Sequence, residues 1–462
     1  MSIRATLKKK GYALGDYVLR VSKDELEAYL EGTNLPSDEE WARLRKELSR
    51  LGLSGILEKP ELKNDRIVVA RGNPPLPGED GRLEFLIDLS HGPKKLDKHH
   101  VDLREMNLVV SVKAGTPVIR RIPPKPGQPG FNVWGEVLPP PPVKEVSFNY
   151  GEGLRPDETN ELLIAEKDGC LVEKRGKLTL RPTYTLEGDV DWNSGNIRFY
   201  GEKLTITGGV RRGFKVLAEG KVEIGGGVED EVEIKVAGDL TVKGFVHGEN
   251  TLVEVSGKAV LKAVEYATVK VKKDLIVKDY ILQARVKVGK SLSVVEGRGL
   301  LAAGEVEVGE GVTVRVAGND SSVATHIEVG RPPEIIEEIE ELKARLLLLD
   351  ETTEKLRKAL TLGRKLNKEG KLTPEKVKIL QKVQNLFHQK MRELMDLQDK
   401  LKQKEEEFSS YQKHTLRVIE KVFPGVTVFI GRYKYEVKTE MVGPIEFYLE
   451  DRKIRTRALS GS

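Results

Sequence analysis

Short stretches of alternating apolar and polar residues recur between residues 186 and 330. In the run Val-Glu-Ile-Lys-Val at 232–236, every second side chain can face a core while its neighbours face water. Small, Gly-containing or charged corners separate the stretches. The first apolar residues after five of these corners lie 18, 19, 16 and 17 residues apart: Val222, Leu240, Ala259, Leu275 and Leu292. A period that drifts by one or two residues is typical of a solenoid. The pattern predicts a parallel β-helix at 186–331, with about eight turns at roughly 18 residues per turn.

The pattern becomes helical at 332–421. Seam residues follow every four and three residues in turn from Ile335 to Leu360, which is a heptad repeat. The repeat breaks at 367–370, and a second helix is expected after Thr373 and Pro374. Every seventh residue of that helix is apolar, while its other seam position is polar (Gln384, Gln398, Glu405, Gln412). These patterns predict an antiparallel coiled-coil hairpin with helices of roughly 35 and 48 residues.

The remaining regions combine short strands with a few helices. Residues 1–100 are expected to form a small α/β domain, in which Ser22 and Glu25 make a capping box for one helix and a second helix runs from Asp38 to Gly52. Residues 101–185 are rich in Pro and Gly and predict a β region. Residues 422–462 return to strands and are expected to cap the open end of the β-helix. The chain is thus predicted to be a multidomain α+β protein with five regions: 1–100, 101–185, 186–331, 332–421 and 422–462.

Composition narrows the possible function classes. The 462 residues include 77 Lys and Arg and 72 Asp and Glu, so the net charge is only +5, and no nucleic-acid partner is expected. Cys170 is the single cysteine, which excludes an intrachain disulfide and a cysteine-based metal cage. It also fits a reducing, cytoplasmic compartment. No run of about 18 apolar residues occurs, so no membrane insertion is expected.

Two polar clusters at the predicted start of the β-helix could bind a ligand. Asp189, Asp191 and Asn193 resemble the beginning of a calcium-binding loop. The glycine comes one position late and strands flank the segment, so a turn is preferred over an ion site. Arg211, Arg212 and Lys215 form a basic spot that could bind an acidic partner, although a solvated turn is the simpler interpretation.

Other motifs favour structural interpretations. Residues 284–291 match the relaxed spacing of a phosphate loop, but strand patterns on both sides indicate a solenoid corner. His99 and His100 are adjacent, and neighbouring side chains on a strand point to opposite faces, which disfavours a shared metal. The acidic cluster at 229–233 alternates with lysines and indicates a solvated outer face. We therefore expect no catalytic residues, no cofactor and no metal site.

Six sequence blocks occur in the order expected of a known family. The strongest is Lys-Pro-Gly-Gln-Pro-Gly-Phe-Asn-Val-Trp-Gly at 125–135, and another, Gly-Asp-Val-Asp-Trp-Asn-Ser-Gly-Asn-Ile at 188–197, precedes the solenoid repeats. With these blocks the chain resembles the bacterial flagellar assembly protein A (FapA) family. The motif residues, which are expected to be structural, are Pro126, Gly127, Gly130, Val133, Gly135, Gly188, Asp189, Asp191, Gly195 and Asn196.

The resemblance implies an N-terminal FapA domain, a right-handed β-helix similar to that of MinC and the bactofilins, and a helical hairpin. It also implies a link to flagellar assembly and cell-pole organisation without catalytic activity. The favoured hypothesis is a non-enzymatic cytoplasmic scaffold that binds protein partners and self-associates through its coiled coil. The alternatives are a MinC-like or bactofilin-like assembly or cell-division regulator, and an enzyme acting on polysaccharide or nucleotide along the β-helix. Envelope or nucleic-acid association through basic strands is a further alternative.

Overall fold

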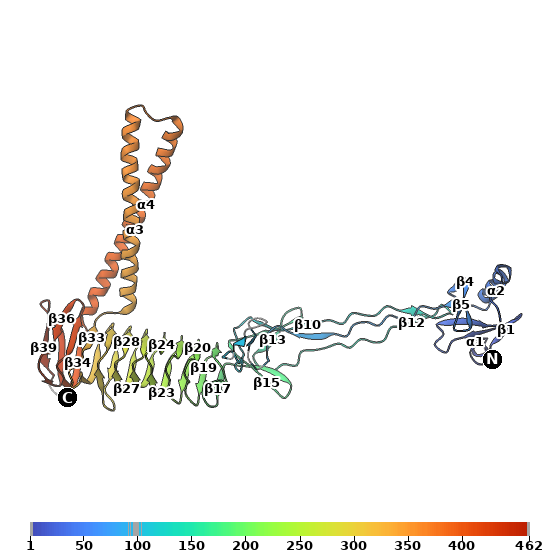
Figure 1. Cartoon of the computed structure of the whole chain (residues 1–462), viewed down its shortest axis with the longest axis horizontal. Helices are drawn as coiled ribbons and strands as arrows, with labels where there is room; N and C mark the ends of the chain where they lie inside the picture. The colour runs from blue at the N-terminus through green and yellow to red at the C-terminus, as the bar shows by residue number, and fades with distance from the viewer. Residues whose placement is uncertain (1–2, 91, 93, 96–100, 103, 460–462) are drawn as a thin grey trace. The chain divides into compact units, whose positions relative to one another are not determined.

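A computed structural model describes residues 3–90, 92, 94–95, 101–102 and 104–459 (Figure 1). Contacts divide the chain into two compact units. Unit 1 comprises 1–87, 115–150 and 154–165, and unit 2 comprises 88–114, 151–153 and 166–462. The predicted regions 1–100 and 101–185 each contribute to both units. The five-region division therefore stays a prediction. His99 and His100 lie outside the described residues.

Unit 1 contains a five-stranded antiparallel sheet with two helices, α1 (Ile3–Lys9) and α2 (Asp38–Arg50). The strand order is β1-β2-β3-β5-β4: β1 Tyr12–Leu14, β2 Tyr17–Val21, β3 Glu27–Glu31, β5 Arg66–Arg71, β4 Ile56–Lys63. The predicted helix at Asp38 is confirmed, and a capping box between Ser37 and Glu40 starts it. The helix predicted after Ser22 is wrong. The Ser22 hydroxyl accepts a hydrogen bond from the Glu27 amide at 2.9 Å, within the turn that joins β2 to β3.

The core of unit 1 includes residues far apart in the sequence. Val133 and Trp134, from the strongest motif block, are buried with Leu7 and Leu48. The chain reaches them through paired extended segments, in which Asn73 bridges Phe131 and Leu76 bridges Gln128. A two-stranded sheet and a four-stranded sheet complete the unit: β11 Gly130–Phe131, β12 Val137–Leu138, β13 Leu154–Pro156, β14 Leu162–Ala165, β10 Pro117–Ile122, β6 Arg82–Phe85.

Unit 2 is built around a β-solenoid of about eight turns, which confirms the central prediction. Its strands alternate between two parallel ladders, visible as a stack in Figure 1. The first ladder contains β17 Thr183–Leu186, β19 Lys203–Ile206, β21 Lys221–Ile224, β23 Leu240–His247, β25 Ala259–Glu265, β27 Leu275–Leu282, β29 Leu292–Val294, β32 Val312–Ala317 and β34 Leu416–Val422. The second ladder contains β18 Ile197–Phe199, β20 Lys215–Ala218, β22 Glu233–Val236, β24 Leu252–Val255, β26 Thr268–Val271, β28 Arg285–Val288, β31 Glu305–Val308, β33 Thr325–Val329 and β35 Val426–Ile430.

The register of the first ladder follows the repeat found in the sequence. The five apolar residues that define the period are direct neighbours in successive turns: Val222 pairs with Leu240, then Ala259, Leu275 and Leu292 follow in order. In the second ladder the inner row includes Val216, Ile234 and Val253, each 0% exposed. The inward-facing side chains of the strands therefore form one continuous core between the ladders.

Other segments of unit 2 extend this stack. Isolated bridges link Val190, Val210, Val228 and Val246 between successive turns, and β30 (Leu300–Ala302) pairs with β27 and β32. A three-stranded sheet precedes the solenoid: β9 Ser111–Val112, β15 Gly169–Lys174 and β16 Lys177–Arg181. Cys170 of β15 is buried, which raises the pKa of its thiol to about 12. A short pair, β7 (Lys94–Lys95) and β8 (Val101–Asp102), lies nearby in the sequence.

Two helices, α3 (Pro333–Lys368) and α4 (Pro374–Ser410), are inserted between successive turns. The ladders continue across the insertion, because Val312 pairs with Leu416 and Thr325 with Val426. The second helix ends at Ser410, earlier than predicted. After a 3-10 turn at Tyr411–Lys413, residues from Leu416 form β34, where alternating side chains join the solenoid core.

The helices pack together along buried Leu349, Leu394 and Leu397. Their ends are linked by ion pairs between Lys404 and Glu338 (2.7 Å) and between Lys343 and Glu405 (3.0 Å). The start of α3 therefore lies beside the end of α4. Antiparallel strands follow the last parallel turn: β36 Tyr433–Glu436, β37 Met441–Val442, β38 Ile445–Glu450 and β39 Lys453–Ala458.

Candidate functional site

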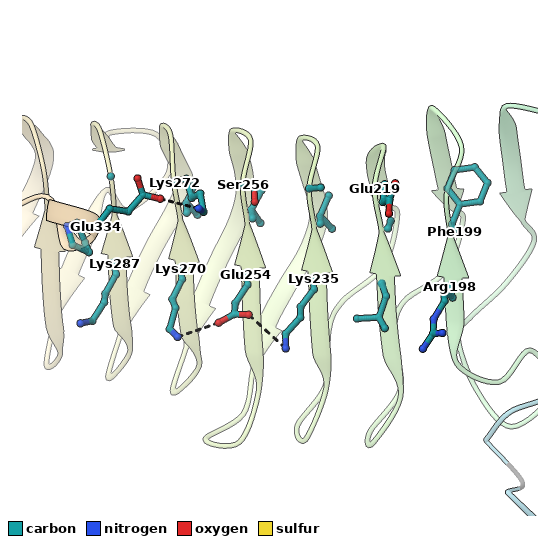
Figure 2. A pocket seen from close by; sticks show the side chains of 18 of the residues that line it. Arg198, Phe199, Glu219, Lys235, Glu254, Ser256, Lys270, Lys272, Lys287 and Glu334 are labelled. Atoms are coloured by element: carbon teal, nitrogen blue, oxygen red, sulfur yellow. Dashed lines mark hydrogen bonds and ion pairs between the residues drawn. The ribbon is translucent and has the colours of Figure 1, made fainter. Parts of the chain in front are cut away.

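A groove of about 650 Å³ runs along the outer face of the second ladder in unit 2. It extends from Arg198 in β18 to Lys287 in β28, and Pro333 and Glu334 at the start of α3 line it as well. Figure 2 shows its side chains following one another from strand to strand. The groove therefore joins the solenoid face to the base of the inserted helices.

The shape of the groove follows from the corner residues of the repeat. The residue directly after each second-ladder strand from β18 to β28 lines the groove, and three of these residues are small: Ala237, Ser256 and Gly289. The turns also approach each other closely here. A methyl group added to Gly257 would lie 2.5 Å from the carbonyl oxygen of Gly238, so glycine is required for this spacing. Small corners thus leave a trough where larger residues would fill the space.

The rim of the groove is a ladder of opposite charges. Glu254 lies between Lys270 at 3.0 Å and Lys235 at 3.7 Å, in adjacent turns (Figure 2). A hydrogen bond and the charge of Glu233, with the charge of Glu254, raise the pKa of Lys235. At the helical end, Lys272 pairs with Glu334 of α3 at 3.0 Å. The rim therefore offers charges of both signs that a partner could exchange for its own.

The floor of the groove is apolar and contributed by the turns themselves. Phe199 and Val255 belong to the solenoid core, yet both also line the groove. The residues that line it include neither histidine nor cysteine. The arrangement is suited to binding an elongated polypeptide surface, because apolar contact and charge exchange are spread over several turns.

The predicted basic spot lies outside this groove and is internally paired. Arg211 contacts Asp189 and Glu229, each at 2.6 Å, and Arg212 contacts Glu231 at 2.5 Å. Lys215 pairs with Glu233 at 2.7 Å. The basic spot and the acidic cluster at 229–233, which the sequence presented as separate features, thus neutralise each other across one turn.

The segment that resembles a calcium loop forms a hydrogen-bonded turn. The Asp191 carboxylate accepts hydrogen bonds from the Asn193 amide at 2.8 Å and the Ser194 amide at 3.3 Å. The Gly209 amide bonds to the Asp189 carboxylate, and this bond, with Arg211, lowers the carboxylate pKa. No group of three or more His, Cys, Asp or Glu placed for a metal ion occurs in the described part of the chain. The Asp191 carboxylate is thus bonded within the turn, whereas the Asp189 carboxylate is bonded to the following turn of the solenoid.

The other motif residues also make internal contacts. Asn196 donates to Glu105 at 2.9 Å and accepts from the Lys215 amide at 2.9 Å. Gly195 and Gly135 adopt positive φ angles of 70° and 77°, and Gly188 of 95°. Gly127 and Gly130 lie where added side chains would meet the facing strand backbone, and exposed Pro126 precedes them. Residues 285–288 of the phosphate-loop-like motif form β28, and Gly289 is a corner.

Sequence reasoning identified the corners but missed the groove between them. The signal that could have located the groove is the coincidence of small corner residues with a neighbouring register row that contains charges of both signs. The contribution of α3 has no such signal, because the approach of Glu334 to Lys272 depends on tertiary structure.

Comparison with known families matches almost the whole chain. Residues 17–176 match the family model "Flagellar Assembly Protein A N-terminal region", and residues 182–454 match "Flagellar Assembly Protein A beta solenoid domain". No curated protein and no solved structure matches the chain. Among the described residues, no helix has the length and apolar character needed to cross a bilayer.

Proposed function

Because the chain belongs to the flagellar assembly protein A family, we propose that it is a non-enzymatic scaffold in flagellar assembly or cell-pole organisation. It works in the cytoplasm through protein–protein interaction, with the solenoid as a rigid spacer. We assign it no catalytic role, cofactor or nucleic-acid partner.

The observation that carries this proposal is the groove along stacked turns that leads to the base of the inserted helices. A partner segment lying there would contact both the solenoid and α3. Its charges would replace the exposed pairs formed by Glu254 and Lys272, which contribute little to stability by themselves. The partner would thereby be held in register with the solenoid turns.

A crosslinking pull-down with the full chain tests this proposal. The double variant Ala237→Trp/Ser256→Trp fills the groove at two exposed corners. The matched control, Thr241→Trp/Thr313→Trp, adds the same two side chains to the outer row of the first ladder. We expect partners captured from a flagellated bacterium to be lost with the groove variant and kept with the control.

Two results contradict the proposal. One is capture of the same partners by the groove variant, and the other is loss of capture by both double variants. Counting flagella in cells that carry each variant as the only copy links the binding result to assembly.

We also propose that α3 and α4 form an antiparallel coiled coil through which two copies associate. Buried Leu349 and Leu394 support the contact within one chain, whereas Leu347 and Leu348 remain 64% and 67% exposed. Sedimentation equilibrium should show a dimer that Leu347→Gln/Leu348→Gln converts to a monomer. A monomeric parent chain at micromolar concentration contradicts this part of the proposal.

The proposal also covers the motif residues and the handedness of the solenoid. The residues of the two motif blocks have structural roles. The β-helix is right-handed. Arg211, Arg212 and Lys215 are proposed as a secondary contact for an acidic partner. Their exposure of about half or more of each side chain supports this role, because a partner carboxylate could compete for their ion pairs.

A further inference from the structure

Positive charge is concentrated at the end of the hairpin that lies furthest along the helices from the solenoid. Residues 354–382, which we call the hairpin tip, contain ten Lys and Arg and three Glu, for a net charge of +7. The whole chain has a net charge of +5. The net positive charge of the tip is therefore larger than that of the entire protein, so the overall composition does not reveal it.

The charges of the tip are poorly compensated. The ion pairs within the tip join Arg357 to Glu354 at 2.9 Å and Lys371 to Glu369 at 2.8 Å. In the described structure, the other eight cations of the tip form no ion pair: Lys355, Lys358, Arg364, Lys365, Lys368, Lys376, Lys378 and Lys382. Near the solenoid, by contrast, lysines of the same two helices pair between helices, as Lys404 does with Glu338. The repulsion at the tip is relieved if an anionic surface binds there.

Aliphatic side chains accompany these cations. Leu362 is 60% exposed and Ile379 is 59% exposed, one on each helix. Leu360, two residues before Leu362, is only 4% exposed. The tip thus retains a packed interior while presenting aliphatic groups and ammonium or guanidinium groups to solvent.

We propose that the hairpin tip binds the anionic surface of a phospholipid membrane peripherally. Clusters of Lys and Arg on amphipathic helices are attracted to anionic headgroups, and exposed Leu and Ile side chains add contact at the headgroup boundary. A single-stranded nucleic acid is less well matched, because base stacking uses aromatic side chains and residues 354–382 contain no Phe, Tyr or Trp. The tip also lies well away from the solenoid end of α3, because Gly363 is thirty residues after Pro333, or roughly 45 Å along the helix.

Vesicle flotation with the full chain tests this inference. The protein is mixed with vesicles of phosphatidylcholine containing 30% phosphatidylglycerol, or of phosphatidylcholine alone. We expect binding to the anionic vesicles only, and a fall of at least tenfold in affinity for Lys365→Glu/Lys368→Glu/Lys371→Glu. The affinity should also fall steeply between about 50 and 300 mM salt.

The matched control is Lys243→Glu/Lys273→Glu/Lys290→Glu, which changes the net charge equally at exposed solenoid positions. It should bind like the parent chain. A second variant, Leu362→Ser/Ile379→Ser, keeps every charge and should reduce binding about threefold or more. Circular dichroism shows whether each variant retains its helices.

Several outcomes overturn the inference: equal binding to both vesicle types, unchanged binding by the tip variant, or equal losses in the tip variant and its control. Tip-dependent binding to duplex DNA that is tighter than binding to anionic vesicles also overturns it. Because the groove residues are untouched, partner capture by the tip variant separates failure of this inference from failure of the proposed scaffold role.

Discussion

The solenoid and the hairpin differ in how far their apolar residues are buried and in how far their charged residues are paired. In the solenoid, inner-row residues such as Ile234 and Val253 are fully buried, and charges pair between adjacent turns, as Lys270 does with Glu254. In the hairpin, Leu347 and Leu348 are mostly exposed, and most cations of the tip have no ion pair in the described structure. Charges are therefore mostly paired between turns along the solenoid and left in excess at the hairpin tip, where we propose that they bind an anionic surface.

The difference shows why overall composition is a poor guide to binding. Lys and Arg nearly balance Asp and Glu in the chain, but this balance conceals paired charges along the solenoid and an excess of +7 at the hairpin tip. A repeat places residues of successive turns in register, so opposite charges can pair at almost every step. Helices of a hairpin offer fewer such neighbours at their free end, where there is no next turn.

The largest expected effect comes from placing a charge in the solenoid core. Ile234→Asp puts a carboxylate between Val216 and Val253, and we expect a loss of more than about 4 kcal/mol in the free energy of unfolding. The same change at exposed Leu348 should cost less than about 0.5 kcal/mol. Urea unfolding followed by circular dichroism measures both, and equal costs would contradict the contrast between the regions.

A smaller loss is expected where the turns approach most closely. Gly257→Ala brings a methyl group to 2.5 Å from the Gly238 carbonyl oxygen, and we expect about 2 kcal/mol of destabilisation. Gly370 in the turn between the helices has open space around it, although its φ is +69°. Gly370→Ala should therefore cost only about 1 kcal/mol. The reverse order in thermal unfolding would show that solenoid turns can move apart more easily than inferred.

A comparable effect with a pH signature is expected at Glu446 of β38, which is 1% exposed. Burial alone would raise the pKa of this carboxyl, but hydrogen bonds from Arg417, Thr415 and Arg457 hold it below its usual value. A carboxyl whose pKa is lower in the folded than in the unfolded state stabilises the protein at pH values above the unfolded-state pKa. This stabilisation is lost as pH falls through the folded-state pKa. Glu446→Gln should therefore cost about 2 kcal/mol at pH 7. The difference should begin to shrink as pH falls below about 4 and should disappear only once pH is below the lowered folded-state pKa.

A pH-independent difference between the Gln variant and the parent chain would contradict this account. Glu338→Gln on α3 is the matched control, because it removes an exposed carboxylate that pairs with Lys404. That change should leave the unfolding midpoint unchanged at either pH.

The smallest effect is expected for the exposed pairs at the start of the solenoid. Arg212→Ala removes the ion pair with Glu231, and both side chains are strongly exposed. The unfolding temperature should shift by less than about 1 °C. A larger shift in differential scanning calorimetry would mean that the paired surface charges hold the turns together.

The sequence predicted those features that depend on local periodicity. The corner spacing placed Val222, Leu240 and Ala259 in the register that the first ladder adopts. The apolar seam likewise located α3 and the first part of α4. In both cases the same residues that make the pattern also make the packing.

Long-range pairings were not predictable in this way. No local signal shows that Leu416 resumes the ladder after Val312, or that Val133 joins a core with Leu7. The failed capping box at Ser22 has a similar cause, because pairing of β2 with β3 decided the conformation there. The groove was missed because its walls combine solenoid corners with the start of α3.

Excision of the hairpin tests the central contrast most directly. Replacing residues 333–410 with a short Gly-Ser linker is sterically reasonable, because Gly330 and Tyr411 are in direct contact and the ladders continue across this point. We predict that the excised chain unfolds cooperatively within a few degrees of the parent chain and no longer floats with anionic vesicles. Loss of the solenoid on excision, or vesicle binding that persists without the hairpin, would contradict the assignment of structure to one region and surface binding to the other.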